Sequence, residues 1–174
     1  DFTIVASGQN SASPHHEPGE TVIKKGDVLV IDIGGTTPSG YCSDSTRTYV
    51  IGECSPDFQS KYEILKEAQE LSIQAVSNDI SAEQLDAVAR DHLGKNDLAK
   101  YFIHRTGHGI GMETHEEPYI VLGNKNQIKD GNAFSIEPGF YIEGKYGARI
   151  EDIVIKTGGK SVNCNNTTKD LVFI

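Results

Sequence analysis

The segment Asp32-Ile-Gly-Gly-Thr-Thr-Pro-Ser-Gly-Tyr-Cys-Ser-Asp44-Ser-Thr-Arg-Thr48 decides the fold, because it holds two carboxylates between two apolar runs. Residues 28–31 form a continuous apolar run typical of a buried strand, and residues 46–51 are rich in β-branched and aromatic side chains. The Gly, Thr, Pro and Ser residues between these runs predict a loop. A carboxylate at the end of a buried strand is too costly to stay ionised alone, so Asp32 needs a partner.

Length, charge and cysteine content limit the function classes. With 174 residues, the chain predicts one compact domain, and its net charge of −9 argues against a nucleic-acid partner. No apolar run approaches the roughly 20 residues that cross a bilayer, so we expect no membrane partner. The first twenty residues do not have the pattern of a signal peptide, and the three cysteines show no CxxC spacing. We therefore expect a cytoplasmic protein without disulfide bonds.

Two amphipathic helices are predicted in the middle of the chain. Apolar residues recur every three or four positions over residues 56–76. Ser81 and Gln84 predict a capping box that opens a second helix, with Gly94 as its end. We expect both helices to be scaffold that packs against a sheet, and residues 158–174 to form a closing hairpin.

Histidines cluster between His104 and His115. The His104 and His108 spacing superficially matches a helical zinc-protease motif, but glycines at 107, 109 and 111 would weaken a helix, and no Glu follows His104. The glycine run is also a poor phosphate-binding motif, because two glutamates and a proline follow it. These glycines instead predict close approach of the backbone to a packed site, with His108 pointing inward. His15 and His16 lie in the loop predicted over residues 8–18, where solvated surface is the default interpretation.

Two further strands are predicted after residue 132, and each carries a glutamate. Glu137 follows the apolar run 133–136 and precedes a Pro-Gly turn. Glu151 lies between Ile150 and Ile153 in a predicted strand over residues 147–155, after a turn at residues 143–145. The second half of the chain thus repeats the first in outline, as a strand pair that carries two carboxylates.

Four carboxylates at strand positions cannot converge without a neutralising charge, because like charges within a few ångströms force protonation or unfolding. Two divalent cations would resolve the repulsion, and oxygen ligands with one imidazole and no thiolate favour Mn²⁺, Co²⁺, Fe²⁺ or Zn²⁺. Two such ions about 3.5–4 Å apart can polarise a carbonyl and activate water for hydrolysis. The alternative is a set of separate salt bridges, for which Arg47, Arg105 and Arg149 are available.

The chain resembles the pita-bread metallopeptidases, and among them the Xaa-Pro branch of aminopeptidase P and prolidase. The matching motifs cover most of the chain in the family's order: Asp-Ile-Gly, Gly-Tyr-Cys-Ser-Asp-Ser-Thr-Arg-Thr, His-Arg-Thr-Gly-His-Gly-Ile-Gly with His-Glu-Glu-Pro, Ser-Ile-Glu-Pro-Gly, and Arg-Ile-Glu-Asp. The resemblance implies an α+β fold with a curved, mostly antiparallel sheet and helices packed on its outer face.

The resemblance also implies roles for individual residues. Five would bind two metal ions, most often Mn²⁺, with Asp44 and Glu151 bridging both: Asp32, Asp44, His108, Glu137 and Glu151. Glu137 would in addition hold the attacking water and help to move its proton. His104 and His115 would line the substrate cleft and contact the scissile carbonyl and the leaving group. His15 would be a third cleft histidine, and Arg149 would orient the surrounding groups.

The expected activity is metal-dependent hydrolysis of an Xaa-Pro bond, in dipeptides or at the N-termini of proline-containing peptides. The helices of the family's first half should precede residue 2, so we expect residues 1–174 to be a single catalytic domain that is incomplete at its N-terminus. The full-length protein is expected to form a homodimer. A non-catalytic pita-bread module that binds peptides or proteins is the alternative, and so is a metal-independent enzyme of the creatinase type. Both alternatives typically lack several of the ligand residues that are present here.

Overall fold

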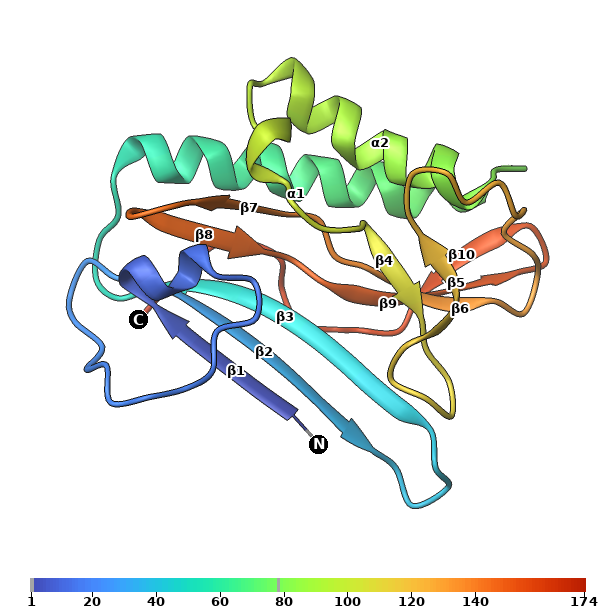
Figure 1. Ribbon diagram of the computed structural model, residues 1–174, viewed down its shortest axis with the longest axis horizontal. Helices are drawn as coiled ribbons and strands as arrows, with labels where there is room; N and C mark the ends of the chain where they lie inside the picture. Colours follow the sequence, from blue (N-terminus) through green and yellow to red (C-terminus); the bar gives the residue numbers. More distant parts are fainter. Residues whose placement is uncertain (1, 78) are drawn as a thin grey trace.

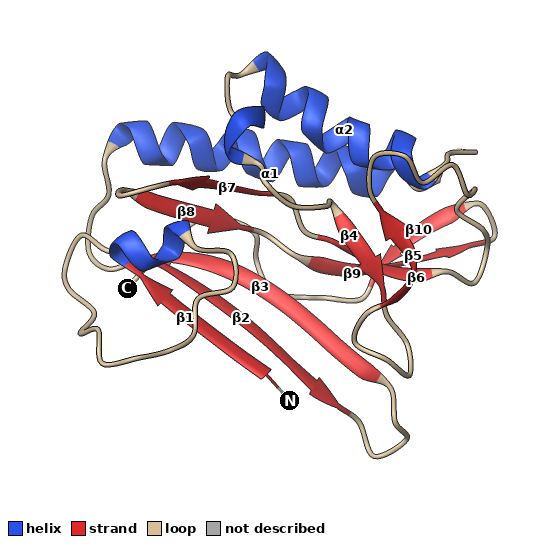
Figure 2. Cartoon of the chain, viewed as in Figure 1, coloured by secondary structure: helices blue, strands red, loops and turns tan. Residues whose placement is uncertain are grey.

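The computed structural model describes residues 2–77 and 79–174. Two helices, α1 (Pro56–Ala75) and α2 (Ala82–Lys95), lie side by side on one face of the molecule (Figure 1). Strands β1 (Phe2–Ser7), β2 (Val28–Thr36) and β3 (Cys42–Val50) lie on the opposite face. Figure 2 shows the same arrangement as one helical layer over a largely antiparallel strand layer. Among the described residues, no helix is long and apolar enough to cross a membrane.

The first sheet contains the opening strands in the order β1-β2-β3-β11. Three antiparallel strands, β1 (Phe2–Ser7), β2 (Val28–Thr36) and β3 (Cys42–Val50), are joined by β11 (Val172–Phe173), which pairs in parallel with β3. The predicted closing hairpin is therefore only partly right. The chain does turn at residues 158–159, but the last strand crosses to the other sheet.

The second sheet has the order β10-β9-β6-β4-β5, and a separate hairpin pairs β7 with β8. The strands of the second sheet are β4 (Gly107–Gly109), β5 (Glu116–Ile120), β6 (Ala133–Ile136), β9 (Asp152–Thr157) and β10 (Lys160–Asn163). The hairpin consists of β7 (Gly139–Ile142) and β8 (Tyr146–Arg149). Two short 3₁₀ helices, Gly8–Ala12 and Ala99–Tyr101, complete the described elements. The first of them occupies a segment that the sequence predicted as loop.

Both α-helices begin where the sequence predicted. The Ser55 side chain accepts a hydrogen bond from the Phe58 amide at the start of α1, and Ser81 and Gln84 form the predicted capping box of α2. The second helix continues one residue past Gly94, to Lys95. The capping residues satisfy amide groups that the first helical turn leaves unpaired.

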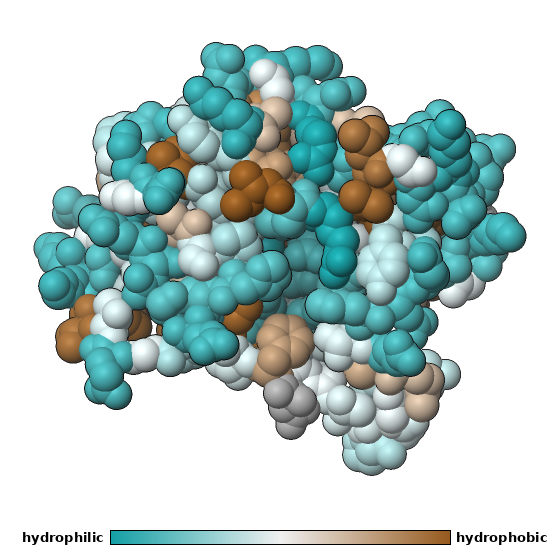
Figure 3. All heavy atoms as spheres, in the orientation of Figure 1, coloured by the Kyte–Doolittle hydropathy of each residue, from teal (hydrophilic) through white to brown (hydrophobic). Residues whose placement is uncertain are grey.

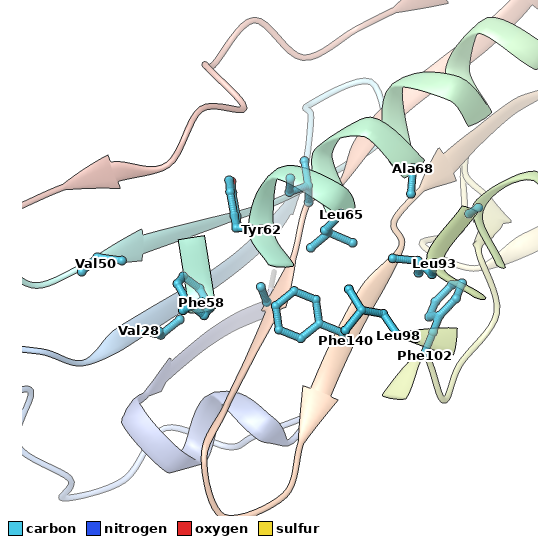
Figure 4. Packing of buried hydrophobic residues seen from close by; sticks show 13 residues of the cluster. Val28, Val50, Phe58, Tyr62, Leu65, Ala68, Leu93, Leu98, Phe102 and Phe140 are labelled. Carbon is cyan, nitrogen blue, oxygen red and sulfur yellow. The ribbon is translucent and has the colours of Figure 1, made fainter. Parts of the chain in front are cut away.

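The hydrophobic core lies between the helices and the strands. Figure 4 shows Phe58 and Leu65 of α1 near Phe140 of β7, with Leu98 close by, and Tyr62 of α1 belongs to the same cluster. A second cluster joins the end of α1 and the start of α2 to the second sheet through Val76, Ala82, Leu85, Ile120, Ile128, Phe134, Ile136 and Val154. The face drawn in Figure 3 is mainly hydrophilic and carries separate hydrophobic patches. The apolar stripes of both helices are thus used in packing, as their periodicity predicted.

Candidate metal centre

Asp32 and Asp44 project from the same face of the β2–β3 pair. In the antiparallel register Asp32 lies opposite Thr46, and Asp44 lies opposite Gly34, two residues farther along β2. Residues two apart on a strand share a face, so the two aspartates are diagonal neighbours. Both strands are longer than the apolar runs 28–31 and 46–51 from which they were predicted, so the two carboxylates lie within strands and not at the ends of the loop. The connection between the strands spans only residues 37–41.

Glu137 and Glu151 lie at breaks between strands of the second half. Pro138 follows Glu137 and has no amide proton to continue a ladder, so the chain leaves β6 there and begins β7 one residue later. Glu151 falls between β8 and β9 and forms an isolated bridge with Thr46. The prediction that Glu151 lies inside a continuous strand over residues 147–155 is therefore wrong, although its side chain is 1% exposed.

His108 lies in β4 between two glycines that allow close packing. A Cβ on Gly107 would overlap the Ser135 backbone, and one on Gly109 would overlap the Glu117 carbonyl. This confirms that the glycines permit close approach of the backbone and place His108 inward, where it is 2% exposed.

The carboxylates and the imidazole converge as a metal site requires. Ligand-type atoms of Asp44, His108 and Glu151 all lie within 4.8 Å of one another. His108 Nε2 is 3.3 Å from Glu137 Oε1 and 3.7 Å from Asp44 Oδ2. Asp32 lines the same cavity as the other four side chains.

The hydrogen bonds leave metal-binding atoms free. His108 Nδ1 lies 3.0 Å from the Gly109 carbonyl, which can only accept, so Nδ1 carries the proton and Nε2 presents a lone pair to the carboxylates. Within the described part of the chain, Oδ1 of Asp32 and Oδ1 of Asp44 are buried without a hydrogen-bond partner. A lone pair and two carboxylate oxygens facing one another are repulsive unless cations lie among them. The donor set therefore fits divalent metal ions.

The metal-free pocket raises the pKa of three of its carboxyl groups. Burial, followed by the charges of Asp32 and Glu137, raises the pKa of Asp44 to about 8. Burial raises the pKa of Glu137 to about 7, with Arg149 opposing the shift. Burial also raises the pKa of Glu151 well above its ordinary value, and Glu137 and Asp44 add to the effect. So much convergent negative charge is stable only when it is protonated or neutralised by cations.

The alternative, in which each carboxylate forms its own salt bridge with an arginine, holds for only one of the four carboxylates, Asp32. Arg149 Nη2 donates to Asp32 Oδ2 at 2.7 Å. Arg47 instead pairs with Asp152, behind the site, at 2.6 Å. Arg105 makes no ion pair within residues 2–77 and 79–174. Three of the four converging carboxylates thus have no arginine partner among the described residues.

A cavity of about 620 Å³ is lined by every residue that the sequence singled out for the site: His15, Asp32, Asp44, His104, His108, His115, Glu137, Arg149 and Glu151. The structure brings all nine together from both halves of the chain. His15 and His115 are exposed at the cavity wall, and the His115 ring packs edge-on against His108 with 4.0 Å between centroids.

The surroundings of His104 differ from those of the other cleft histidines. Its Nδ1 lies 2.7 Å from the Arg105 carbonyl, so Nδ1 is protonated, and its Nε2 accepts from the Tyr141 hydroxyl at 2.8 Å. Burial lowers the pKa of His104 to about 3, which keeps the ring neutral. Both ring nitrogens therefore already have protein partners, whereas those of His115 make no hydrogen bond to the described residues. As placed here, His115 is better suited than His104 to donate to a ligand.

Three supporting residues were missed by the sequence analysis. Tyr141 links His104 to Arg149, whose Nη1 donates to the tyrosine oxygen at 2.8 Å. Ser135 accepts from the His108 amide and donates to Glu137 Oε1, at 2.9 and 3.0 Å. The third is Thr46, which donates to Glu151 Oε2 at 2.6 Å. A hydroxyl within an apolar strand run needs a buried partner, and that signal could have found Tyr141 and Ser135.

Comparisons with known proteins agree with this geometry. The chain is 51% identical over 173 residues to the probable dipeptidase PepE of Mycobacterium tuberculosis, and 45% identical over 174 residues to the Xaa-Pro dipeptidase of Lactobacillus helveticus. Each alignment covers 99% of this chain and 46% of the relative, so the chain spans about half the length of the curated relatives it matches.

Solved structures show the same fold. The dipeptidase PepE of Mycobacterium ulcerans superposes with a TM-score of 0.97 at 51% identity, covering 99% of this chain and 47% of that one. The prolidase of Thermococcus sibiricus gives a TM-score of 0.96 at 50% identity, with the same coverage. These matches confirm the α+β pita-bread fold. Because the model of metallopeptidase family M24 matches residues 1–157, the chain belongs to that family.

Proposed function

We propose that the protein hydrolyses Xaa-Pro peptide bonds with two divalent metal ions held by Asp32, Asp44, His108, Glu137 and Glu151. The observation that carries this proposal is the meeting of these side chains in one cavity with two buried aspartate oxygens unpartnered in the described chain. The relatives named as dipeptidases and Xaa-Pro dipeptidases support the substrate class. Bound there, the ions would polarise the scissile carbonyl and supply activated water.

The chain's own side chains would handle the protons and position the substrate. Glu137 lies beside His108 and accepts a hydrogen bond from Ser135, so its carboxylate is held where it could accept a proton from the attacking water and return it to the leaving group. His115 would donate to the carbonyl oxygen or to the leaving nitrogen as charge develops. Arg149 would fix Asp32 and, through Tyr141, the His104 ring.

We further infer Mn²⁺ as the native ion, because four carboxylates and one imidazole form an oxygen-rich donor set; Co²⁺, Zn²⁺ and Fe²⁺ would also fit it. Dimerisation of a longer polypeptide is proposed from the family resemblance alone. A cytoplasmic location is supported by Cys42, Cys54 and Cys164, which are all free thiols. A net charge of −9 supports peptides rather than nucleic acid as partners.

The test combines metal binding with an activity assay. Titration calorimetry of the chain with Mn²⁺ should give two equivalents, and crystals soaked in Mn²⁺ should show two anomalous peaks between Asp44 and Glu151. With Mn²⁺ the chain should release proline from Gly-Pro, while Glu137→Gln should lose at least about 100-fold in rate because it removes both a ligand and a proton acceptor. Two bound ions without hydrolysis of Gly-Pro or of an Xaa-Pro tripeptide would favour the binding module.

A further inference from the structure

The connecting segment between β10 and β11, residues 164–171, contacts both sheets close to the candidate metal ligands. In Figure 1 the chain after β10 passes between β9 and β3 on its way to the C-terminus. Asn165 of this segment is half-buried and is not one of the residues that line the cavity. An influence of Asn165 on the site must therefore pass through the residues that it holds.

The Asn165 side chain joins one strand of each sheet. Its Oδ1 accepts from the Ile153 amide in β9 at 2.7 Å, and its Nδ2 donates to the Asp44 carbonyl in β3 at 3.1 Å. A side-chain amide has the same kinds of donor and acceptor as a peptide group. Asn165 therefore links the two strands as an additional peptide unit would, at a point where a side chain replaces strand pairing.

The two hydrogen bonds connect the proposed bridging ligands. Asp44 is one of these ligands, and Ile153 lies two residues after the other, Glu151. A second contact joins the same two regions, because the Glu151 amide donates to the Thr46 carbonyl at 3.1 Å. Alternate residues of a strand direct their backbone groups to the same edge, so the carbonyls of Asp44 and Thr46 lie along one edge of β3. The two contacts together set the distance between the backbones that carry Asp44 and Glu151.

The connecting segment is itself fixed on both sides of the asparagine. Before it, the Cys164 amide donates to the Ile153 carbonyl at 2.9 Å. After it, the buried Arg47 donates to the carbonyls of Thr167 and Thr168, at 3.0 and 2.9 Å. The side-chain amide is thus presented to β3 and β9 from a backbone that other contacts hold in place.

The spacing of the two bridging carboxylates matters because each would contact both metal ions. A displacement of one strand relative to the other would lengthen bonds to both ions at once. Groups that orient metal ligands without touching the ion typically change metal affinity by about 10- to 100-fold when they are removed.

We propose that Asn165 is a positioning residue for the metal pair, because it fixes the spacing of Asp44 and Glu151 by holding the Asp44 carbonyl and the Ile153 amide. This assignment rests on the proposed two-metal function and adds a determinant outside the cavity. The alternative is that Asn165 only ends β10, and then its bond to Ile153 alone would matter.

Asn165→Asp separates the two interpretations. At pH 7.5 the introduced carboxylate keeps an acceptor for the Ile153 amide but turns an oxygen, in place of a donor, toward the Asp44 carbonyl. The added negative charge by itself would tighten Mn²⁺ binding, whereas loss of the donor should weaken it by about 10-fold or more. Titration calorimetry with Mn²⁺ gives the sign. Asn165→Ala, which removes both hydrogen bonds, should weaken binding at least as much.

Asn166→Asp is the matched control, because Asn166 is exposed, makes no hydrogen bond to the described residues and lies next to Asn165. It adds the same charge and should bind Mn²⁺ at least as tightly as the unmodified chain. The EPR spectrum at saturating Mn²⁺ is the second measurement, because it reports the magnetic coupling of two ions that share ligands. Asn165→Asp and Asn165→Ala should change this coupling, which a loss of stability alone would not do once both sites are filled.

Equal or tighter Mn²⁺ binding by Asn165→Asp would overturn the positioning role, and so would unchanged coupling in both variants. Hydrolysis of Gly-Pro by the unmodified chain would then still support the proposed function. Failure of that function has a different signature, namely two bound ions without hydrolysis, and the affinities and spectra still decide the role of Asn165. An unmodified chain that binds no Mn²⁺ would contradict both.

Discussion

The Thr46 hydroxyl donates a 2.6 Å hydrogen bond to Oε2 of Glu151 and so joins the first sheet to the junction of β8 and β9. The two residues also share a backbone contact, since the Glu151 amide donates to the Thr46 carbonyl at 3.1 Å. Arg149 Nε donates to the same hydroxyl at 3.1 Å. Thr46 therefore orients Glu151, a proposed bridging ligand, without being one of the proposed ligands itself.

Thr46→Val should weaken metal binding without changing the volume of the site. It leaves Glu151 Oε2 and Arg149 Nε without a partner, and loss of such an outer hydrogen bond typically costs about 10- to 100-fold in metal affinity. Calorimetry with Mn²⁺ measures the effect, and Thr46→Ser, which keeps the hydroxyl, is the control. Unchanged affinity in Thr46→Val would show that Glu151 is held by its backbone contact alone.

The metal-free chain should lose stability as the pH rises from 6.5 to 8. The pKa of Asp44 is raised to about 8 and that of Glu137 to about 7, so the folded state holds protons that the unfolded state has released. His104 and His108, whose pKa values are lowered to about 3 and about 4, act in the opposite direction, and this effect fades above pH 6.5 as the histidines of the unfolded chain lose their protons. Each retained proton contributes a slope of about 1.4 kcal/mol per pH unit.

Denaturant unfolding in EDTA at pH 6.5, 7.2 and 8 measures this slope. Asp44→Asn should flatten it, because the amide does not titrate. Saturating Mn²⁺ should abolish or reverse it, since the ligands must lose their protons to bind the ion. Stability that rises with pH in EDTA would contradict the raised pKa values.

Helix α2 holds the histidine segment in place, although the sequence assigned it no chemistry. Asp86 binds Arg90 through two 2.9 Å bonds and accepts from the amide and hydroxyl of Thr106. Arg90 also donates to the carbonyls of Phe102 and His104. The Thr106 carbonyl in turn accepts from the Glu137 amide at 2.8 Å, so this network reaches a proposed ligand.

Asp86→Asn should therefore destabilise the chain by about 3 kcal/mol, because it leaves Arg90 without its anion. The double variant Asp86→Asn with Arg90→Met should cost less than the sum of the two single changes, since it removes both partners of one interaction. Unfolding in denaturant gives all three values. Strict additivity would mean that the two side chains act independently.

The sequence predicted the parts of the site whose signals are local. The apolar period of α1 and the capping box of α2 depend on neighbouring residues, and both helices begin where expected. The ligand-type residues were found because a carboxylate or histidine in an apolar stretch needs a partner wherever the chain takes it. Pro138 signalled the strand break after Glu137, but the same reasoning could not locate the break at Glu151, which depends on how separate sheets meet.

Contacts between residues far apart in the sequence could not be predicted from the sequence pattern. Nothing near Val172–Phe173 indicates that this strand pairs in parallel with β3, about 120 residues earlier. Asp86 and Thr106 lie 20 residues apart, and their contact depends on how α2 packs beside β5. Which arginines form ion pairs within residues 2–77 and 79–174 likewise depends on the fold, because Arg47 and Arg149 find their aspartate partners more than 100 residues away.

The closest packing in the site is at Gly107, and it gives a last prediction. Gly107→Ala would force a methyl group into the Ser135 backbone and against its hydroxyl, which holds the His108 amide and Glu137 Oε1. Because β4 and β6 are adjacent strands, the overlap can be relieved only by separating them, at a cost of about 1–3 kcal/mol. Thermal unfolding should show the loss and calorimetry a weaker Mn²⁺ affinity, while Gly19→Ala, with open space around its Cβ, should match the unmodified chain. An alanine at 107 that left both measurements unchanged would mean that β4 is free to move away from Ser135 and that His108 is not fixed by this contact.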